Sequence, residues 1–283
     1  MKEATSMIFV CCHKRIEVPH TSLLHPIQVG AALADDRFPG FLSDDVGKSI
    51  STKNRSYCEL TAQYWAWKNF RAEHYGFFHY RRFLYPDQKE RRPYRIEGEP
   101  TQGLLHKLRF EDFPKLIDGS DMIMPIGEDM HITVRKHYEN APYHYGSDLE
   151  LTEQILREMH PECVSAMEEY LSGTVLYFGN IYIMRRDVFN DYCAWLFPIL
   201  EEFDHLADIS GYNTQEQRVD GFLAERLLGV YYFWRRGELK TLELPRVHFE
   251  PDTGKRIREK AVNLLLPPGT VRRAYIKRLY RGK

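Results

Sequence analysis

The sequence lacks the signatures of several large enzyme classes. It contains no P-loop, no glycine-rich dinucleotide fingerprint, no nucleophile elbow and no zinc-binding helix motif. It also has no apolar run near the roughly 20 residues that a membrane-spanning helix needs. The apolar segment at 7–12 is too short for the core of a signal peptide. These absences argue against the common kinases, dehydrogenases and hydrolases, and they predict a protein that remains in the cytoplasm.

The cysteines show neither a disulfide framework nor a metal-binding pattern. The five cysteines are odd in number and lack paired metal-ligand spacing, so we expect reduced thiols, mostly in the core. His131, His137 and His144 are spaced too loosely to indicate a metal site. Apolar residues, in contrast, make up 43% of the 283 residues and aromatic residues 13%. This content supports a sizeable core in one large domain or two small ones.

The net charge of −1 hides a strong asymmetry. Between Lys255 and Lys283 there are ten Lys and Arg residues and a single acid, Glu259, which gives a net charge of +9. The preceding 254 residues therefore carry −10. A cationic end on an acidic body argues against nucleic acid as a partner, because proteins that bind nucleic acids normally spread positive charge over their binding face.

The cationic end also has an amphipathic pattern. Apolar residues from Val262 lead through a turn into a basic segment at 271–281, which is predicted to form a short helix. Such a helix can lie on an anionic lipid surface; a solvated basic tail is the alternative. We therefore predict one domain over 1–250 and a basic tail over 251–283 that associates peripherally with the inner face of the cell membrane.

Strand-like and helix-like segments alternate along the chain, which predicts an α/β domain with a largely parallel sheet. Strands are expected near 7–12, 75–80, 121–125, 175–184 and 241–248. Helices are expected near 57–72, 104–117, 148–159, 161–171, 187–206 and 215–229. Residues 21–54 and 86–103 are rich in polar residues, proline or glycine, and they are predicted to be loops.

The most informative stretch is 75–85, an apolar segment that ends in His79, Arg81 and Arg82. The planar fork of arginine matches phosphate oxygens, and ligands of α/β proteins bind at the carboxyl ends of strands. The pattern therefore indicates a site for a diphosphate-bearing ligand. Surface ion pairs between these arginines and nearby acids are the alternative interpretation.

Other polar residues are expected near the same edge of the sheet. Those that follow strands are His13, Lys14 and Asn180, and those from the loop and the next helix are Asp44, Asp45, Lys48 and Glu59. The late acids Glu216, Asp220 and Glu225 are candidates for a general base, which contributes about 10²–10⁴ in rate. Alternatively, Glu225 forms a buried ion pair with Arg226, and Asp220 caps a helix.

Several blocks of the sequence resemble a known family. They are 24–30 (LHPIQVG), 57–61 (YCELT), 64–69 (YWAWKN), 79–83 (HYRRF), 179–184 (GNIYIM), 195–200 (WLFPIL) and 221–228 (GFLAERLL). Together they resemble the bacterial family called domain of unknown function 4422, from capsule and O-antigen gene clusters. That family looks like a branch of the GT-A glycosyltransferases, with a Rossmann-type, mostly parallel sheet.

The resemblance implies transfer of a sugar from a nucleotide diphosphate, with a UDP-sugar as the expected donor; some members are thought to transfer galactofuranose. It places His13, Lys14 and Asp45 at the nucleotide. Arg81 and Arg82 would bind the diphosphate, and His79 a phosphate or the sugar. Asn180 and Tyr182 would face a sugar, with Asp220 or Glu225 as the base of an inverting reaction.

The sequence departs from the GT-A pattern at one place. GT-A enzymes commonly carry an Asp-x-Asp motif that holds a divalent metal, whereas the corresponding strand end here is 79–81, which has no acid. Because two arginines can neutralise a leaving diphosphate, we expect a metal-independent enzyme. In the competing interpretation, Asp44 or Asp45 brings in Mg²⁺ or Mn²⁺.

The expected acceptor is an oligosaccharide on a membrane-bound polyprenyl diphosphate. Two other functions stay open. A nucleotidyl- or phosphotransferase would also use Arg81 and Arg82, but it would need metal-binding acids at the same strand end. A non-catalytic carbohydrate-binding or scaffold protein of a polysaccharide assembly complex would bind no UDP or GDP.

Overall fold

The computed structural model describes residues 4–281. The strands are β1 (Ala4–Cys12), β2 (Leu24–Gln28), β3 (Leu42–Ser43), β4 (Ala72–His79), β5 (Arg82–Leu84), β6 (Tyr94–Glu97), β7 (Met122–Pro125), β8 (Glu128–Asp129), β9 (Val175–Leu176), β10 (Tyr182–Arg185), β11 (Thr241–Leu244) and β12 (Arg246–Phe249). The α-helices are α1 (Asn54–Tyr57), α2 (Leu60–Asn69), α3 (Gln102–Lys107), α4 (Phe113–Asp118), α5 (Val134–Glu139), α6 (Gly146–Met159), α7 (Val164–Ser172), α8 (Arg186–Leu206), α9 (Val219–Arg235), α10 (Thr253–Leu265) and α11 (Val271–Arg281).

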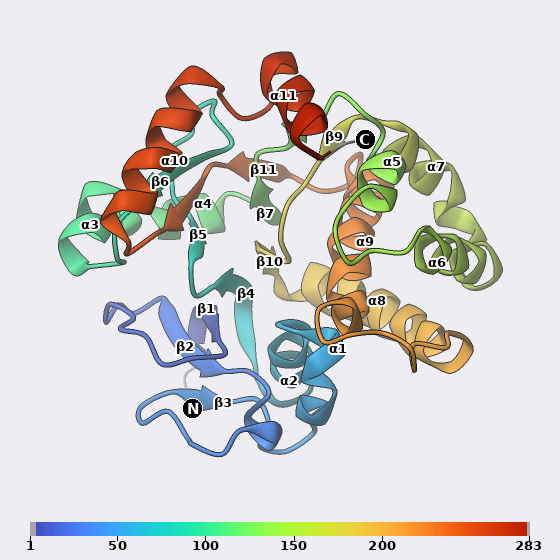
Figure 1. Ribbon diagram of the computed structural model, residues 1–283. Helices are drawn as coiled ribbons and strands as arrows, with labels where there is room; N and C mark the ends of the chain where they lie inside the picture. Colours follow the sequence, from blue (N-terminus) through green and yellow to red (C-terminus); the bar gives the residue numbers. More distant parts are fainter. Residues whose placement is uncertain (1–3, 282–283) are drawn as a thin grey trace.

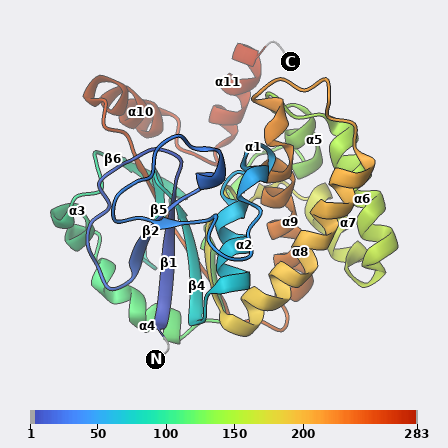
Figure 2. The same ribbon diagram turned by 90° about the horizontal axis from the view of Figure 1, so that it is seen from below.

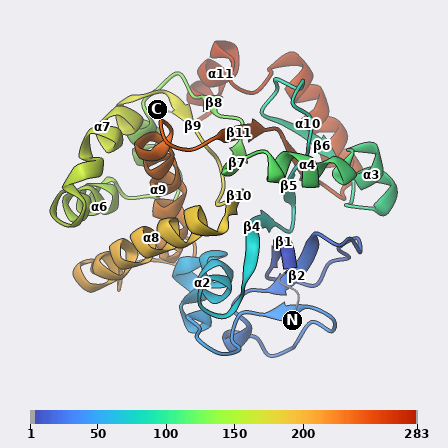
Figure 3. The ribbon, with the colours of Figure 1, turned by 180° about the vertical axis from the view of Figure 1, so that it is seen from behind.

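The central sheet is mostly parallel, as predicted. Its main path has the order β11-β7-β10-β4-β1-β2-β3, which can be followed from β11 to β2 in Figure 3 and on to β3 in Figure 1. Strand β10 runs antiparallel to both neighbours, β4 and β7, and every other pair on this path is parallel. Strand β12 adds a small extension, antiparallel to β5 and parallel to β6. The predicted α/β fold is therefore confirmed.

Both faces of the sheet are covered by helices (Figures 1 and 2). Helices α2, α8 and α9 lie over one face, and α3 and α4 lie over the other. The side chains of β1 alternate between these faces: Phe9 and Cys11 join the first core, and Ile8 and Val10 join the second. Alternation with both sides apolar is the pattern of a strand buried on two faces.

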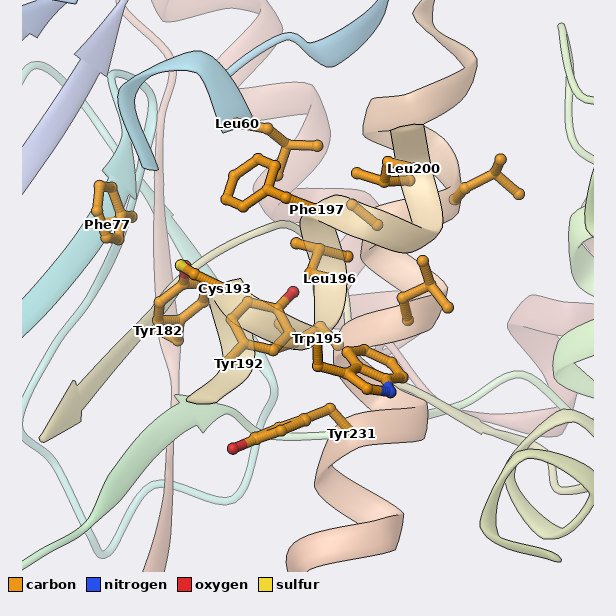
Figure 4. Close-up of a cluster of buried hydrophobic side chains, with 14 of the residues drawn as sticks. Leu60, Phe77, Tyr182, Tyr192, Cys193, Trp195, Leu196, Phe197, Leu200 and Tyr231 are labelled. Carbon is orange, nitrogen blue, oxygen red and sulfur yellow. The ribbon is translucent and has the colours of Figure 1, made fainter. Parts of the chain in front are cut away.

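Aromatic side chains fill the larger core. Tyr182 on β10 packs against Tyr192 of α8, with ring centroids 5.5 Å apart, and Tyr231 of α9 lies 5.0 Å from Tyr192 (Figure 4). The Tyr182 hydroxyl donates a hydrogen bond to Gln63 Oε1 at 2.9 Å. These contacts fix β10, and with it the loop that precedes this strand, against two long helices.

Two predicted loops contain strands. Residues 24–28 form β2, which pairs in parallel with β1, so the expected irregular segment 21–54 is wrong in part. The insertion 86–103 contains β6. The expected helix over 57–72 is interrupted at Cys58, whose φ of 51° lies in the left-handed region. The strands in 21–54 and 86–103 were missed because their short apolar runs have no clear period.

The basic C-terminal segment is helical. Helix α11 matches the predicted basic helix, but Val262 belongs to the longer helix α10, which begins at an Asp252 cap that accepts from the Lys255 amide at 2.7 Å. The Lys260 ammonium contacts Glu97 of β6 at 3.1 Å. The segment therefore lies against the domain. None of the helices between residues 4 and 281 is both long and apolar enough to cross a membrane.

Candidate functional site

A cavity of about 680 Å³ opens beside the carboxyl end of β4, where the arginine pair was predicted to bind its ligand. Its volume lies in the range of small-molecule sites. Its polar lining residues include Glu59, His79, Arg81, Arg82, Lys136, His137, His144, Asn180, Arg218, Glu225 and Arg226. Five of these side chains are Lys or Arg and two are Glu. The cavity is therefore suited to an anionic ligand.

His79 is a neutral hydrogen-bonding group between the cations of the β4 end. Burial, followed by the neighbouring Arg82 and Arg81, lowers the pKa of His79 well below its usual value. The backbone N–H of Arg81 donates to His79 Nδ1 at 3.2 Å. The neutral ring therefore carries its proton on Nε2 and has one N–H to offer a phosphate or hydroxyl oxygen. The side chains of Arg81 and Arg82 are exposed in the cavity.

The two carboxylates of the cavity differ in their partners. Glu59, directly before α2, accepts a hydrogen bond from the Asn180 amide at 2.9 Å. Asn180 is 4% exposed and also donates to the Gly221 carbonyl at 3.2 Å. Because the side-chain N–H groups of Asn180 are used by protein acceptors, this residue orients Glu59, and its contact with a sugar stays a prediction. Within residues 4–281, Glu59 forms no ion pair, and Asn180 is its side-chain hydrogen-bond partner.

Glu225, in contrast, is part of an ion pair. Its carboxylate contacts the Arg226 guanidinium, which is only 2% exposed, and accepts from the Gly179 backbone N–H. The Arg226 guanidinium also lies 5.1 Å from the ring of Tyr138. A buried charge needs such a partner, because an unpaired one is costly. The sequence-based alternative, in which Glu225 pairs with Arg226, therefore holds.

The remaining wall is apolar and aromatic. His144 stacks on Phe222, with ring centroids 4.0 Å apart and an interplanar angle of 16°. Burial, followed by Arg226, lowers the pKa of His144 to about 4, so the ring is neutral at pH 7. Phe178 and Ile132 also line this wall. Such surfaces suit the apolar faces of sugar or nucleobase rings.

Two predicted nucleotide contacts lie next to the cavity rather than in its lining. The ring of His13 is 4.7 Å from that of Tyr80, edge to face, and the Lys14 ammonium lies 5.4 Å from the same ring. Burial lowers the pKa of His13, and Lys14 and Arg81 add to the effect. The ends of β1 and β4 therefore meet, as the parallel pairing required. The role of these residues stays a prediction.

The predicted loop acids are used for structure. Asp44 is fully buried and accepts from the backbone N–H groups of Gly30 at 2.8 Å and Ala31 at 3.0 Å. Asp45 pairs with Arg37 at 2.5 Å. Neither residue lines the cavity. Both carboxylates are occupied by protein donors, so they do not fit the metal site of the competing interpretation, and Asp45 is separated from the proposed nucleotide.

Asp220 and Tyr182 also lie outside the cavity lining. Asp220 is fully buried and accepts a hydrogen bond from Ser56, and Tyr182 is fully buried in the aromatic core. Neither side chain can reach a ligand in this structure. Asp220 as a base and Tyr182 as a sugar contact are therefore not supported by the geometry.

The end of β4 does not resemble a metal site. Between residues 4 and 281, no group of three or more His, Cys, Asp or Glu side chains is placed to hold a metal ion. The groups at the strand end are Arg81, Arg82 and a histidine whose Nδ1 already accepts a backbone N–H. These residues do not fit a divalent cation, and metal independence stays a prediction.

Sequence reasoning missed several lining residues. Arg218 and Arg226 lie close in sequence to the predicted acids Asp220 and Glu225. Their positive charge there could have indicated that these two arginines line the site. Lys136 and the aromatic wall come from segments without a clear period, so their position depends on tertiary packing. Cys58 also lines the cavity, but burial and the nearby Glu59 raise the pKa of its thiol to about 12, so it stays protonated.

Comparison with known proteins gives one family and one solved structure. A family model described as domain of unknown function (DUF4422) matches residues 7–236. The solved structure, titled as the apo structure of a WbbM bifunctional glycosyltransferase, matches with a TM-score of 0.82 at 31% sequence identity. This match covers 87% of the chain described here and 45% of the other, so our chain spans less than half the length of that structure. No curated protein matches. The resemblance inferred from the sequence blocks is confirmed: the chain belongs to the DUF4422 family.

Proposed function

We propose that this protein is a glycosyltransferase that moves a sugar from a nucleotide diphosphate to a growing glycan. The observation that carries the proposal is the cavity beside β4, where five cations and two carboxylates surround a space of about 680 Å³. The likeness to a structure titled as a glycosyltransferase supports the same reaction class. That structure is described as bifunctional, and our chain corresponds to less than half of it.

Arg81 and Arg82 would bind the diphosphate of the donor. Each guanidinium can donate two parallel hydrogen bonds to phosphate oxygens. As the bond between the anomeric carbon and the phosphate oxygen breaks, the nucleotide diphosphate leaves with the electron pair. The two arginines would stabilise the negative charge that develops on it. His79 Nε2–H would donate to the same phosphate or to the donor sugar.

Glu59 is the better candidate for the base that an inverting transfer needs. The acceptor hydroxyl oxygen would form the new bond to the anomeric carbon, and its proton would move to the Glu59 carboxylate. Asn180 orients this carboxylate through a hydrogen bond at 2.9 Å, and no arginine or lysine pairs with it among residues 4–281. Glu225 is neutralised by Arg226 and is better suited to holding the cavity wall.

The donor and acceptor proposed here are supported by chemistry and by the family resemblance. A UDP-sugar, with galactofuranose as the sugar, is the donor that we propose. The aromatic wall of His144 and Phe222 offers a flat face for a sugar ring. For the acceptor we propose an oligosaccharide on a polyprenyl diphosphate, within the synthesis of a capsular polysaccharide or O-antigen.

Binding of UDP, GDP, CMP and dTDP, each with and without EDTA, tests this function by calorimetry. We expect UDP to bind, with an affinity that EDTA leaves unchanged. Hydrogen bonds to charged groups contribute about 1.5–3 kcal/mol, so Arg81→Ala and Arg82→Ala should each weaken binding about 10- to 100-fold. Arg91→Ala removes the same charge from an exposed position outside the cavity lining and should bind like the parent.

Release of UDP from UDP-galactofuranose then tests the base. Glu59→Gln should bind UDP within about threefold of the parent but release it about 10²–10⁴ times more slowly. Glu225→Gln should mainly lower the melting temperature, because Arg226 loses its partner. Absence of binding by all four nucleotides would reject the donor site and favour a carbohydrate-binding scaffold. Equal release rates for Glu59→Gln and the parent would remove Glu59 as the base.

A further inference from the structure

Helix α10 turns its apolar residues toward solvent. Ile257, Leu264 and Leu265 are 63%, 81% and 75% exposed, and the small Ala261 between them is exposed too. The spacing i, i+4, i+7, i+8 puts these four residues on one face of the helix. No residue of α10 is buried. Helices of water-soluble domains normally bury such a stripe, so this face is suited to a partner.

The opposite face of α10 holds the helix in this orientation through polar contacts. Arg256 donates to the Glu250 carbonyl at 2.9 Å, and Lys260 contacts Glu97 at 3.1 Å. Asn263 accepts from Arg273 of α11 at 2.5 Å and from the Tyr94 hydroxyl at 3.3 Å. The outward direction of the apolar stripe is therefore built into the contacts of the helix with the domain.

Helix α11 continues the same kind of surface. Val271 and Tyr275, one turn apart, are 67% and 61% exposed, and Arg272 beside them is exposed too. Figures 1 and 2 both place α10 and α11 along one edge of the molecule. The sequence of this region carries a net charge of +9. A second copy would bring the same positive charge, whereas an anionic lipid bilayer supplies both an apolar interior and negative headgroups.

We propose that the exposed faces of α10 and α11 bind an anionic lipid bilayer and hold the cavity close to it. Ala274 of α11 is one of the residues that line the cavity. The loop between the two helices contacts another rim segment, where Gly269 O lies 2.9 Å from His131 Nε2. The same helices thus form part of the cavity and part of the face that binds the bilayer. Delivery of a lipid-linked acceptor to the site rests on the proposed function, but bilayer binding does not.

Co-sedimentation with vesicles tests the inference. The full chain should sediment with vesicles of phosphatidylcholine mixed with phosphatidylglycerol, and at least about tenfold less with phosphatidylcholine alone. The triple variant Ile257→Ser, Leu264→Ser, Leu265→Ser should lower binding to the anionic vesicles by at least about tenfold, because the apolar contribution is lost. Leu206→Ser changes a leucine that is 56% exposed at the end of α8 and should bind like the parent.

Calorimetry with UDP and light scattering separate the outcomes. The triple variant should keep the parent's melting temperature and UDP affinity, which shows that the fold and the cavity are intact. Vesicle binding by a parent that binds no nucleotide would reject the proposed function and leave this inference standing. Equal vesicle binding by the triple variant and the parent would overturn the inference. Concentration-dependent dimers that the triple variant abolishes would overturn it too, because a second copy would then cover the face.

Discussion

At the scale of single residues, three predicted or observed acids near the cavity have three different environments. Glu59 accepts a hydrogen bond from the amide of Asn180, Glu225 is paired with Arg226, and Asp220 is buried beside Ser56. Asp220 and Glu225 are five residues apart on one helix, so at about 100° per residue their side chains point roughly 140° apart. Only one of them can face the cavity.

Asp220 makes the stability of the protein depend on pH. Burial, followed by the nearby Asp204 carboxylate, raises the pKa of Asp220 to about 8. Between about pH 4 and pH 8 the folded state keeps a proton that the unfolded chain has lost, so this group's contribution to the free energy of unfolding falls as the pH rises. Asp220→Asn keeps the acceptor for Ser56 and removes the titration. We expect the melting temperature of Asp220→Asn, relative to that of the parent, to rise by several degrees or more between pH 5 and pH 8, since each kcal/mol shifts it by about 2–4 °C.

Thermal unfolding at several pH values measures this difference. Asp118→Asn, at an exposed position of α4, serves as the matched control and should leave the pH profile of the parent unchanged. A melting temperature lowered equally at pH 5 and pH 8 in Asp220→Asn would mean that the folded protein needs the ionised carboxylate.

The arginines of the site could be predicted from the sequence, whereas the base could not. Arg81 and Arg82 follow the end of β4 closely. Chain connectivity alone therefore places them at that edge of the sheet. The choice between Glu59 and Glu225 depends on which partner each carboxylate meets. The Glu225–Arg226 pair joins neighbours on α9 and could be anticipated, whereas Asn180 meets Glu59 only when the segment before β10 packs against the start of α2.

At the scale of secondary structure elements, the close contact between α7 and α9 depends on a glycine in α9. A Cβ added at Gly229 of α9 would lie 2.1 Å from Cζ of Tyr170, a fully buried ring of α7. We expect Gly229→Ala to destabilise the fold by about 1–3 kcal/mol through overpacking. This corresponds to roughly 2–12 °C in melting temperature.

Gly103→Ala is the matched control for this helix contact. Gly103 lies in α3, and an added Cβ there would meet nothing within 4 Å. Since alanine favours a helix over glycine by about 0.5–1 kcal/mol, this variant should be as stable as the parent or slightly more so. Equal melting temperatures for Gly229→Ala and the parent would show that the two helices can separate without cost.

Most helices could be predicted from their period, and the long helix α8 matches the expected 187–206 almost fully. Strand β2 was missed because its five residues include a proline and a histidine and give no alternation. The antiparallel direction of β10 could not be inferred, because direction depends on how the chain returns to the sheet and not on the residues of the strand.

At the scale of the whole molecule, the boundary of the domain can be tested by truncation. A chain ending at residue 250 loses α10 and α11, whose ion pairs with the body use exposed lysines and contribute about 0–1 kcal/mol each. We expect it to unfold cooperatively, with a melting temperature less than about 10 °C below that of the full chain. Circular dichroism measures this transition.

A chain ending at residue 237 is the companion variant. It also loses β11 and β12, and with them the buried side chains of Leu244, Val247 and Phe249. We expect no cooperative transition for this shorter chain, because both strands pair with the central sheet. Loss of cooperativity already in the chain ending at 250 would make the basic segment an integral part of the domain.

The pairing of β11 with β7 has a consequence for synthesis of the chain. Strand β7 ends at Pro125, and its partner β11 ends about 120 residues later. At roughly 5–20 residues per second, a ribosome takes about 6–24 s to supply that partner. During this interval the edge of β7 is open to pairing with other nascent chains. Folding yield in the cell should therefore depend on whether a chaperone shields the open edge of β7 until β11 has been synthesised.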